Sequence, residues 1–206
     1  MDNYDLQVDM AKRIFLEYDQ ERMIGKFCLK ADDQWIYLTY LNSPCRICRQ
    51  TGRVEERKQD TWTECRDYST VMTIYDLLCF YKGDAAPVLA GSWCSAGSFV
   101  VTGVNSDTFT KKYAKLFDGC LPELKAACEA LGGVLQPAMA GADVTCQFPV
   151  TSFFPVLLQF WEGDEEFPPK LMLLWDRNAD RFLHYETTFY LQGDLLERLW
   201  KRFLKS

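Results

Sequence analysis

Residues 154–176 read FPVLLQFWEGDEEFPPKLMLLWD, and this stretch decides the fold. It contains two apolar runs, 156–161 and 171–175, on either side of an acidic, proline-containing segment at 162–169. Short and nearly continuous apolar runs bounded by turn residues are typical of strands that are covered on both faces. The stretch therefore predicts a strand, an acidic turn and a second strand.

The remaining sequence predicts helices and further strands around this unit. Helical periodicity predicts helices over 4–18, 71–82, 107–117, 121–131 and 185–203, with Gly83 as the residue that ends the second of them. Residues 35–41, 45–50 and 53–57 are expected to form a small antiparallel meander, and 144–148 a strand. Residues 90–103 are rich in Gly and Ser and are expected to form a loop. We expect an α+β fold with a mixed, largely antiparallel sheet packed against several helices in a single domain, 1–206.

The first helix, 4–18, places apolar residues at helical spacing. Leu6, Met10, Ile14, Phe15 and Tyr18 recur at intervals of three or four residues or lie side by side. Such a pattern is typical of a helix that packs one face on the core. We therefore expect these side chains to be buried.

Composition and charge exclude several classes of protein. The chain of 206 residues is 48% hydrophobic and 15% aromatic, which is typical of a globular protein. Its formal net charge of −6 disfavours nonspecific binding to nucleic acid or to anionic lipid, because both need a basic face on the protein. No run is apolar enough to cross a membrane, and the acidic start does not resemble an export signal. Nine cysteines without such a signal indicate reduced thiols and a cytoplasmic location.

The acidic turn is the first candidate site. Asp164, Glu165 and Glu166 lie in the turn and Asp176 follows the second strand, so their carboxylates are expected to meet at one end of the sheet. Oxygen ligands of this kind suit Mg²⁺ or Ca²⁺, and crowding also raises a carboxyl pKa and so creates a general acid or base. The competing interpretation is a solvated turn in which Gly163 permits the bend.

The cysteines provide a second candidate. Cys45 and Cys48 form a C-x-x-C pair, and Cys28 and Cys65 are available to complete a set of four thiolates for zinc or an iron–sulfur group. On a regular strand Cys45 and Cys48 point to opposite faces, so joint chelation requires a local turn. The alternative interpretation is that these are thiols of the core.

The remaining candidates are a histidine and two tryptophans. His184 is the sole histidine, which excludes metal sites that need two or three, and it is expected to hydrogen-bond at the entry to the last helix. Trp93 and Trp161 are candidates for lining a pocket for a flat ligand, although aromatic residues on strands are more often part of the core. Phosphate-binding glycine motifs are missing, so the sequence predicts no particular cofactor.

The stretch from Phe153 to Glu186 resembles the C-terminal signature of an uncharacterised family, domain of unknown function 3786. That family carries a similar apolar strand led by proline, an acidic turn with Gly-Asp-Glu-Glu-Phe-Pro, and a second strand that ends in Asp. Thr51 to Val54, Tyr75 to Leu78 and Ala90 to Trp93 agree more weakly, so the family-like region covers about 34–192. The resemblance implies an anaerobic context, and some relatives add an iron–sulfur segment for which this chain lacks a closely spaced run of four cysteines.

These observations lead to three functional hypotheses. The first is an accessory domain without catalytic activity that binds an unknown protein partner or a small ligand or cofactor in anaerobic metabolism. The second is a hydrolase that uses a divalent metal on the carboxylates of 162–176. The third is a metal or redox protein built on its cysteines.

Overall fold

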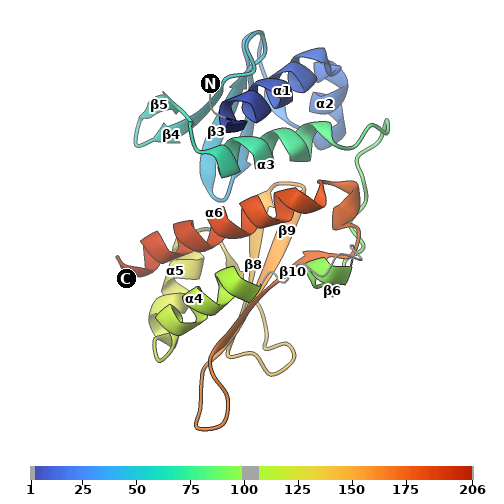
Figure 1. Cartoon of the computed structure of the whole chain (residues 1–206). Helices are drawn as coiled ribbons and strands as arrows, with labels where there is room; N and C mark the ends of the chain where they lie inside the picture. The colour runs from blue at the N-terminus through green and yellow to red at the C-terminus, as the bar shows by residue number, and fades with distance from the viewer. Residues whose placement is uncertain (1–2, 99–106, 206) are drawn as a thin grey trace.

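The computed structural model describes residues 3–98 and 107–205, and in this part of the chain two antiparallel sheets of five strands are packed with six α-helices. The predicted α+β fold with largely antiparallel pairing is thereby confirmed, with the strands divided between two sheets (Figure 1). The loop expected at 90–103 lies outside the described residues from residue 99 onward. None of the helices in the described ranges combines the length and apolar character that crossing a bilayer requires.

The first sheet is a meander of consecutive strands. It consists of β1 (Lys30–Ala31), β2 (Trp35–Tyr40), β3 (Ser43–Cys48), β4 (Val54–Lys58) and β5 (Thr61–Glu64). Leu41 and Asn42 join β2 to β3 with positive φ angles of 44° and 61°, as a tight two-residue hairpin turn requires. Ser43 and Pro44, which lie between the strands expected at 35–41 and 45–50, therefore begin β3.

Three helices belong to the first half of the chain. They are α1 (Asn3–Glu17), α2 (Gln20–Phe27), which the sequence did not predict, and α3 (Tyr68–Cys79). In Figure 1 they lie on one side of the first sheet. Helix α3 ends at Cys79 with Phe80 as its cap, so Gly83 lies beyond the helix and does not end it. Asp67 caps the start of α3, because its side chain accepts a hydrogen bond from the backbone N–H of Thr70.

The second sheet contains the strands that the sequence predicted best. Its order is β6 (Trp93–Cys94), β10 (Lys170–Asp176), β9 (Phe154–Trp161), β8 (Val144–Thr151) and β7 (Val134–Leu135). The register of β9 and β10 pairs Lys170 with Trp161 and Trp175 with Val156. Helices α4 (Asp107–Phe117), α5 (Leu121–Ala130) and α6 (Tyr185–Phe203) accompany this sheet, and short 3-10 turns lie at Ala96–Ser98 and Ala179–Arg181.

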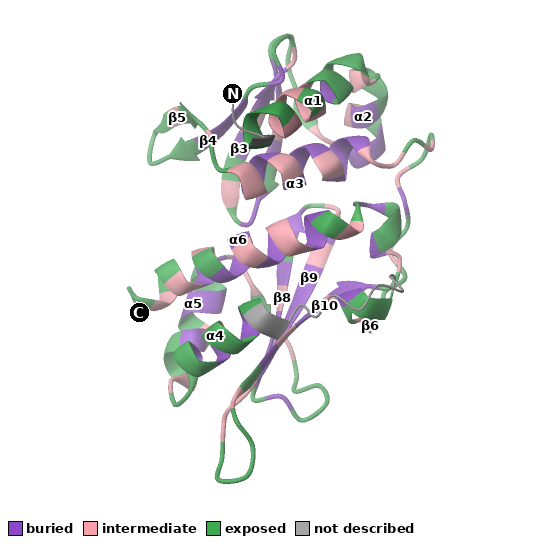
Figure 2. Ribbon diagram, in the orientation of Figure 1, coloured by how far each residue is buried: buried purple, intermediate pink, exposed green. Residues whose placement is uncertain are grey.

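The two halves are joined by packing of α3 against α6 and by a shared core. Buried apolar residues from both sheets belong to one contiguous cluster. The turn between β2 and β3 also reaches the second sheet, because the N–H of Leu41 donates to the carbonyl oxygen of Val150 at 2.9 Å. This packing leaves α1 on the outside of the molecule, with α3 between it and α6 (Figures 1 and 2).

A buried polar network crosses the same interface. Arg198 on α6 donates to Asp194 on its own helix at 2.7 Å, to Glu56 on β4 at 2.9 Å and to Ser43 on β3 at 3.1 Å. It also donates to Thr70 on α3 at 3.0 Å. Burial alone raises the pKa of Glu56, but the hydrogen bond and charge of Arg198 outweigh it and lower that pKa below its ordinary value.

Candidate functional site

The carboxylates of the 162–176 unit do not converge, contrary to the expectation from sequence. The turn precedes β10 and Asp176 ends it, so a strand of seven residues, about 20 Å at 3.3 Å per residue, separates them. Asp176 is 3% exposed and accepts hydrogen bonds from the backbone N–H groups of Ala90, Gly91 and Asn178 at 2.8–2.9 Å. It therefore holds a neighbouring loop in place.

The acidic turn itself is exposed and organises its own backbone. Asp164 accepts hydrogen bonds from the N–H groups of Phe167 at 2.7 Å and Glu166 at 2.8 Å, and these bonds lower the pKa of its carboxyl. Glu165 and Glu166 are exposed beside it. These contacts fit the interpretation as a solvated turn.

The candidate tryptophans lie at opposite ends of the second sheet. Trp93 pairs with Asp176 at the end of β10, whereas Trp161 pairs with Lys170 at its start. Trp161 donates from its indole N–H to the carbonyl oxygen of Ala140 at 3.3 Å. The two rings therefore do not form one aromatic wall.

The three candidate cysteines do not form one group, because Cys45 belongs to the core cluster and Cys65 packs against that cluster, whereas Cys48 is not part of it. Cys45 is buried in the core, where burial raises its pKa to about 12, and burial also raises the pKa of Cys65. Burial raises the pKa of Cys48 as well, but hydrogen bonds to Thr51 outweigh it and the net pKa is lowered. Within 3–98 and 107–205 no three His, Cys, Asp or Glu side chains gather closely enough to hold a metal ion.

His184 is at the entry to α6, as the sequence predicted, and its partner is Asp76 on α3. The carboxylate of Asp76 lies 2.6 Å from the ring Nδ1 of His184 and accepts from its backbone N–H at 2.7 Å. It also accepts from the hydroxyl of Thr187 at 2.6 Å. A carboxylate at this position complements the positive end of the α6 dipole. When the ring is neutral and donates from Nδ1–H to Asp76, its other nitrogen, Nε2, is an acceptor on a side chain that is 61% exposed.

This pair lies at one end of a groove formed by α1, α3 and α6, which we call the helical groove. The helical groove holds a cavity of about 500 Å³. Its apolar lining includes Met10, Ile14, Met72, Tyr75, Phe80 and Tyr190. The ring of Phe80 packs edge-on against His184 with 4.3 Å between centroids.

The opposite end of the helical groove is closed by a tyrosine cluster. The hydroxyl of Tyr68 on α3 donates to the side-chain oxygen of Gln7 on α1 and lies 3.5 Å from the hydroxyl of Tyr190 on α6. Tyr4 packs edge-on against Tyr68 with 4.9 Å between centroids. The helical groove is therefore mainly apolar, with tyrosine hydroxyl groups toward one end and Asp76 and His184 at the other.

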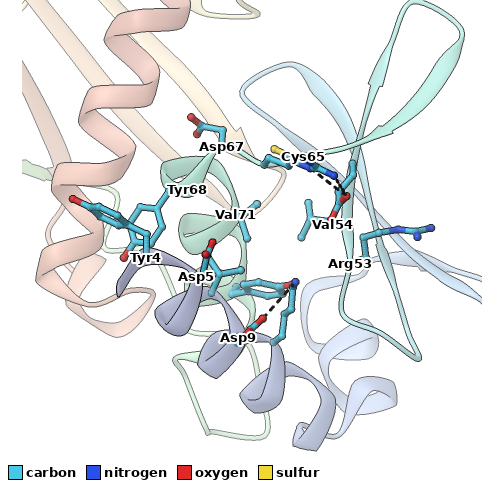
Figure 3. Close-up of a pocket in the computed structure, with 14 residues that line it drawn as sticks. Tyr4, Asp5, Asp9, Arg53, Val54, Cys65, Asp67, Tyr68 and Val71 are labelled. Carbon is cyan, nitrogen blue, oxygen red and sulfur yellow. Dashed lines mark hydrogen bonds and ion pairs between the residues drawn. The ribbon is translucent and has the colours of Figure 1, made fainter. Parts of the chain in front are cut away.

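A second cavity, of about 510 Å³, lies on the other side of α1 against β4 and β5 (Figure 3). Its rim is charged, but its charges are matched by neighbours. Lys12 lies 3.8 Å from Asp9, and Arg53 lies 2.8 Å from Glu55. In Figure 3, Arg53 extends away from Val71 and the floor of the cavity. The helical groove has the more apolar lining and is the better candidate for ligand binding.

The sequence predicts a role for His184 at this site but does not point to Asp76 or to the helical groove. A signal for Asp76 was present, because it is the one acidic residue in the apolar stretch from Val71 to Cys79. A single carboxylate in a helix that is otherwise mostly buried needs hydrogen-bond donors from elsewhere in the fold. Here the donors come from α6, more than 100 residues along the chain.

Comparison with known proteins identifies the family. The chain matches the family described as a domain of unknown function (DUF3786) over residues 8–198, and it belongs to that family. The resemblance noted for residues 34–192 is thus confirmed and extends further toward the N-terminus. No curated protein and no solved structure matches the chain.

Proposed function

We propose that this protein is a binding domain without catalytic activity of its own, and that a small, mainly apolar ligand binds in the helical groove. The observation that carries the proposal is the groove itself: about 500 Å³ lined by methionine and aromatic side chains next to one histidine–carboxylate pair. Small-molecule sites are commonly of this size, with a mostly apolar wall and a few polar groups that orient the ligand.

The polar end of the helical groove defines the chemistry of the ligand. With Nδ1–H bound to Asp76, the Nε2 atom of His184 accepts a hydrogen bond, and Glu186 beside it adds an acceptor. The ligand should therefore carry a hydroxyl or N–H donor at one end of an apolar body. Met10 and Met72 adjust their side chains readily, which favours irregular or planar shapes.

Among the described residues, one cysteine lines the helical groove, and it is not an activated nucleophile. Cys79 lies along the helical groove, but burial raises its pKa to about 12, so at neutral pH it is a thiol. The acidic turn and Asp176, which the metal-hydrolase hypothesis uses, lie at opposite ends of β10. Among the described residues, no three Cys, His, Asp or Glu side chains gather closely enough to hold a metal ion. We propose a binding role in the cytoplasm, in the anaerobic context that the family resemblance implies.

The test uses N-phenyl-1-naphthylamine, a fluorescent probe with an apolar body and one N–H donor. Its fluorescence should rise on titration with the full chain and give a dissociation constant in the micromolar range. Met72→Arg places a charge on the groove floor and should weaken probe binding at least about tenfold, because a desolvated charge is unfavourable there. His184→Phe keeps an aromatic ring but removes the acceptor, and should weaken binding about three- to tenfold.

Val134→Arg is the matched control, because Val134 is an exposed apolar residue on β7 in the other sheet. This variant should bind the probe as tightly as the unchanged protein. Probe binding that is equal in all four proteins would place the probe outside the helical groove and contradict the proposal, as would the absence of any binding.

A further inference from the structure

The lining of the helical groove is ordered along its length. On α3, Tyr68, Met72 and Asp76 all line the groove at intervals of four residues, so they form one row along the helix. On α6, His184 caps the start of the helix and Tyr190 lies six residues later, and both line the groove. The row on α3 therefore places a hydroxyl, an apolar side chain and a carboxylate one after another.

The polar groups of the two helices meet because α3 and α6 run in opposite directions along the groove (Figure 1). Tyr68 at the start of α3 lies beside Tyr190, with their hydroxyl oxygens 3.5 Å apart. Asp76 toward the end of α3 contacts His184 at the start of α6. At about 1.5 Å per residue, the two polar ends are about 12 Å apart along α3 and about 9 Å apart along α6. Both helices thus give the groove a similar length between its polar ends.

The tyrosine end has a hydroxyl group that its neighbours satisfy poorly. The hydroxyl of Tyr68 donates to the side-chain oxygen of Gln7, so its proton is already engaged. The distance of 3.5 Å between the hydroxyls of Tyr68 and Tyr190 exceeds the usual O–H···O range of about 2.5–3.0 Å. The ring of Tyr190 is held in place, because it packs edge-on against Tyr68 with 5.2 Å between centroids. Its hydroxyl is therefore a positioned donor for a ligand in the groove.

The charges at the other end favour a neutral donor on the ligand. Asp76 and Glu186 both line the groove beside His184, so a ligand carboxylate placed there would meet two like charges. Lys82 also lines the groove, but its ammonium lies over the ring of Tyr18, 4.7 Å from the centroid. A hydroxyl or N–H group on the ligand avoids this repulsion and can donate to Nε2 of His184.

We infer that the ligand of the helical groove is an elongated molecule with two polar ends, a donor at His184 and a hydroxyl or carbonyl oxygen at Tyr190. The inference rests on the proposed function and adds to it the length of the ligand and a second polar group. Two directly joined phenol rings with hydroxyl groups at their far ends match the spacing of the polar ends. Met72, midway between Tyr68 and Asp76, lies along the middle of this body.

Displacement of N-phenyl-1-naphthylamine from the full chain tests this inference with three unlabelled compounds, biphenyl, 4-hydroxybiphenyl and 4,4′-dihydroxybiphenyl. The dihydroxy compound should bind about three- to tenfold more tightly than the monohydroxy compound, because it makes one more hydrogen bond to the protein. The monohydroxy compound should exceed biphenyl by a similar factor, since it gains the first of these hydrogen bonds.

Each polar end can be removed without removing its ring. Tyr190→Phe deletes the hydroxyl and His184→Phe deletes the acceptor. In either variant the dihydroxy and monohydroxy compounds should bind within about twofold of each other, because one hydrogen-bonding end remains for both. Tyr37→Phe is the matched control, since it removes a tyrosine hydroxyl that donates to Asp32 on the first sheet, outside the groove lining. It should preserve the ratio of the unchanged protein, and circular dichroism checks the fold of every variant.

Three results would overturn the inference and leave the proposed function standing, provided that the naphthylamine probe binds and Met72→Arg weakens it. They are equal affinity of the dihydroxy and monohydroxy compounds in the unchanged protein, an advantage of the dihydroxy compound that persists in Tyr190→Phe, and failure of all three compounds to displace the probe. Absence of probe binding would instead refute the proposed function and this inference with it.

Discussion

Replacing Arg198 with alanine is expected to lower the free energy of unfolding by about 3–5 kcal/mol, because it leaves buried carboxylates without their cation. The side chains of Arg198, Asp194 and Glu56 are only 17%, 8% and 11% exposed. When the guanidinium is removed, water therefore solvates the carboxylates of Asp194 and Glu56 poorly. The guanidinium also bridges four elements, α6, α3, β3 and β4, so its loss weakens the contact between the two halves of the fold.

Thermal unfolding followed by circular dichroism measures this effect. For a chain of this length, one kcal/mol corresponds to about 2–4 °C, so Tm should fall by about 6–20 °C at neutral pH. Lys201→Ala is the control, because its ion pair with Glu197 is more than half exposed on both sides. Such a pair contributes little, and Tm of this control should change by no more than about 2 °C.

The pH dependence gives a second readout with a defined sign. Arg198 lowers the pKa of Glu56 from its ordinary value of 4.5. A depressed carboxyl pKa stabilises the folded state above pH 4.5, and this stabilisation is lost as the pH falls through the lower folded pKa. The difference between the unchanged protein and Arg198→Ala should therefore shrink below pH 4.5. A loss under about 1 kcal/mol at pH 7, or a difference that stays constant down to about pH 3, would refute the reasoning.

Two further predictions concern stability. Asp176→Ala removes the acceptor of three backbone N–H groups and should lower the free energy of unfolding, measured in urea, by about 2–3 kcal/mol. The neighbouring loop should also be cleaved faster by a protease. The control Glu166→Gln, in the exposed turn, should lower the free energy of unfolding by under about 0.5 kcal/mol. Gly133→Ala should destabilise by about 1–3 kcal/mol, because its Cβ would lie 2.4 Å from the sulfur of Cys146. Gly25→Ala, inside α2 with open space around it, should stabilise by about 0.5–1 kcal/mol, and equal effects of the two alanines would contradict the packing described.

Local patterns in the sequence were sufficient for most elements of the fold. The runs at 156–161 and 171–175 became the central strands β9 and β10, and periodicity over 185–203 identified α6 in spite of Gly193. These predictions hold because alternation and helical spacing depend on neighbours a few residues apart. The short strands β6 and β7 were missed, since two residues carry no periodic signal.

The candidate site depended on contacts that no local pattern contains. The acidic turn and Asp176 are close in sequence, but a strand holds them at opposite ends of the sheet. His184 was recognised from its position before a helix, whereas its partner Asp76 is 108 residues away. The spacing of α1 showed an apolar face without showing whether the core would cover it.

The sequence by itself determined the α+β class, the central hairpin and the apolar face of α1. Only the tertiary structure decided that α1, α3 and α6 enclose a groove. It also showed that Leu6, Met10 and Ile14, which the sequence predicted to be buried, are exposed by 47%, 62% and 47%. The physical reason is that periodicity specifies which face of an element is apolar, while burial depends on which other elements are near enough to cover that face. Helix α3 packs against both α1 and α6, while Leu6, Met10 and Ile14 on the outer side of α1 face water.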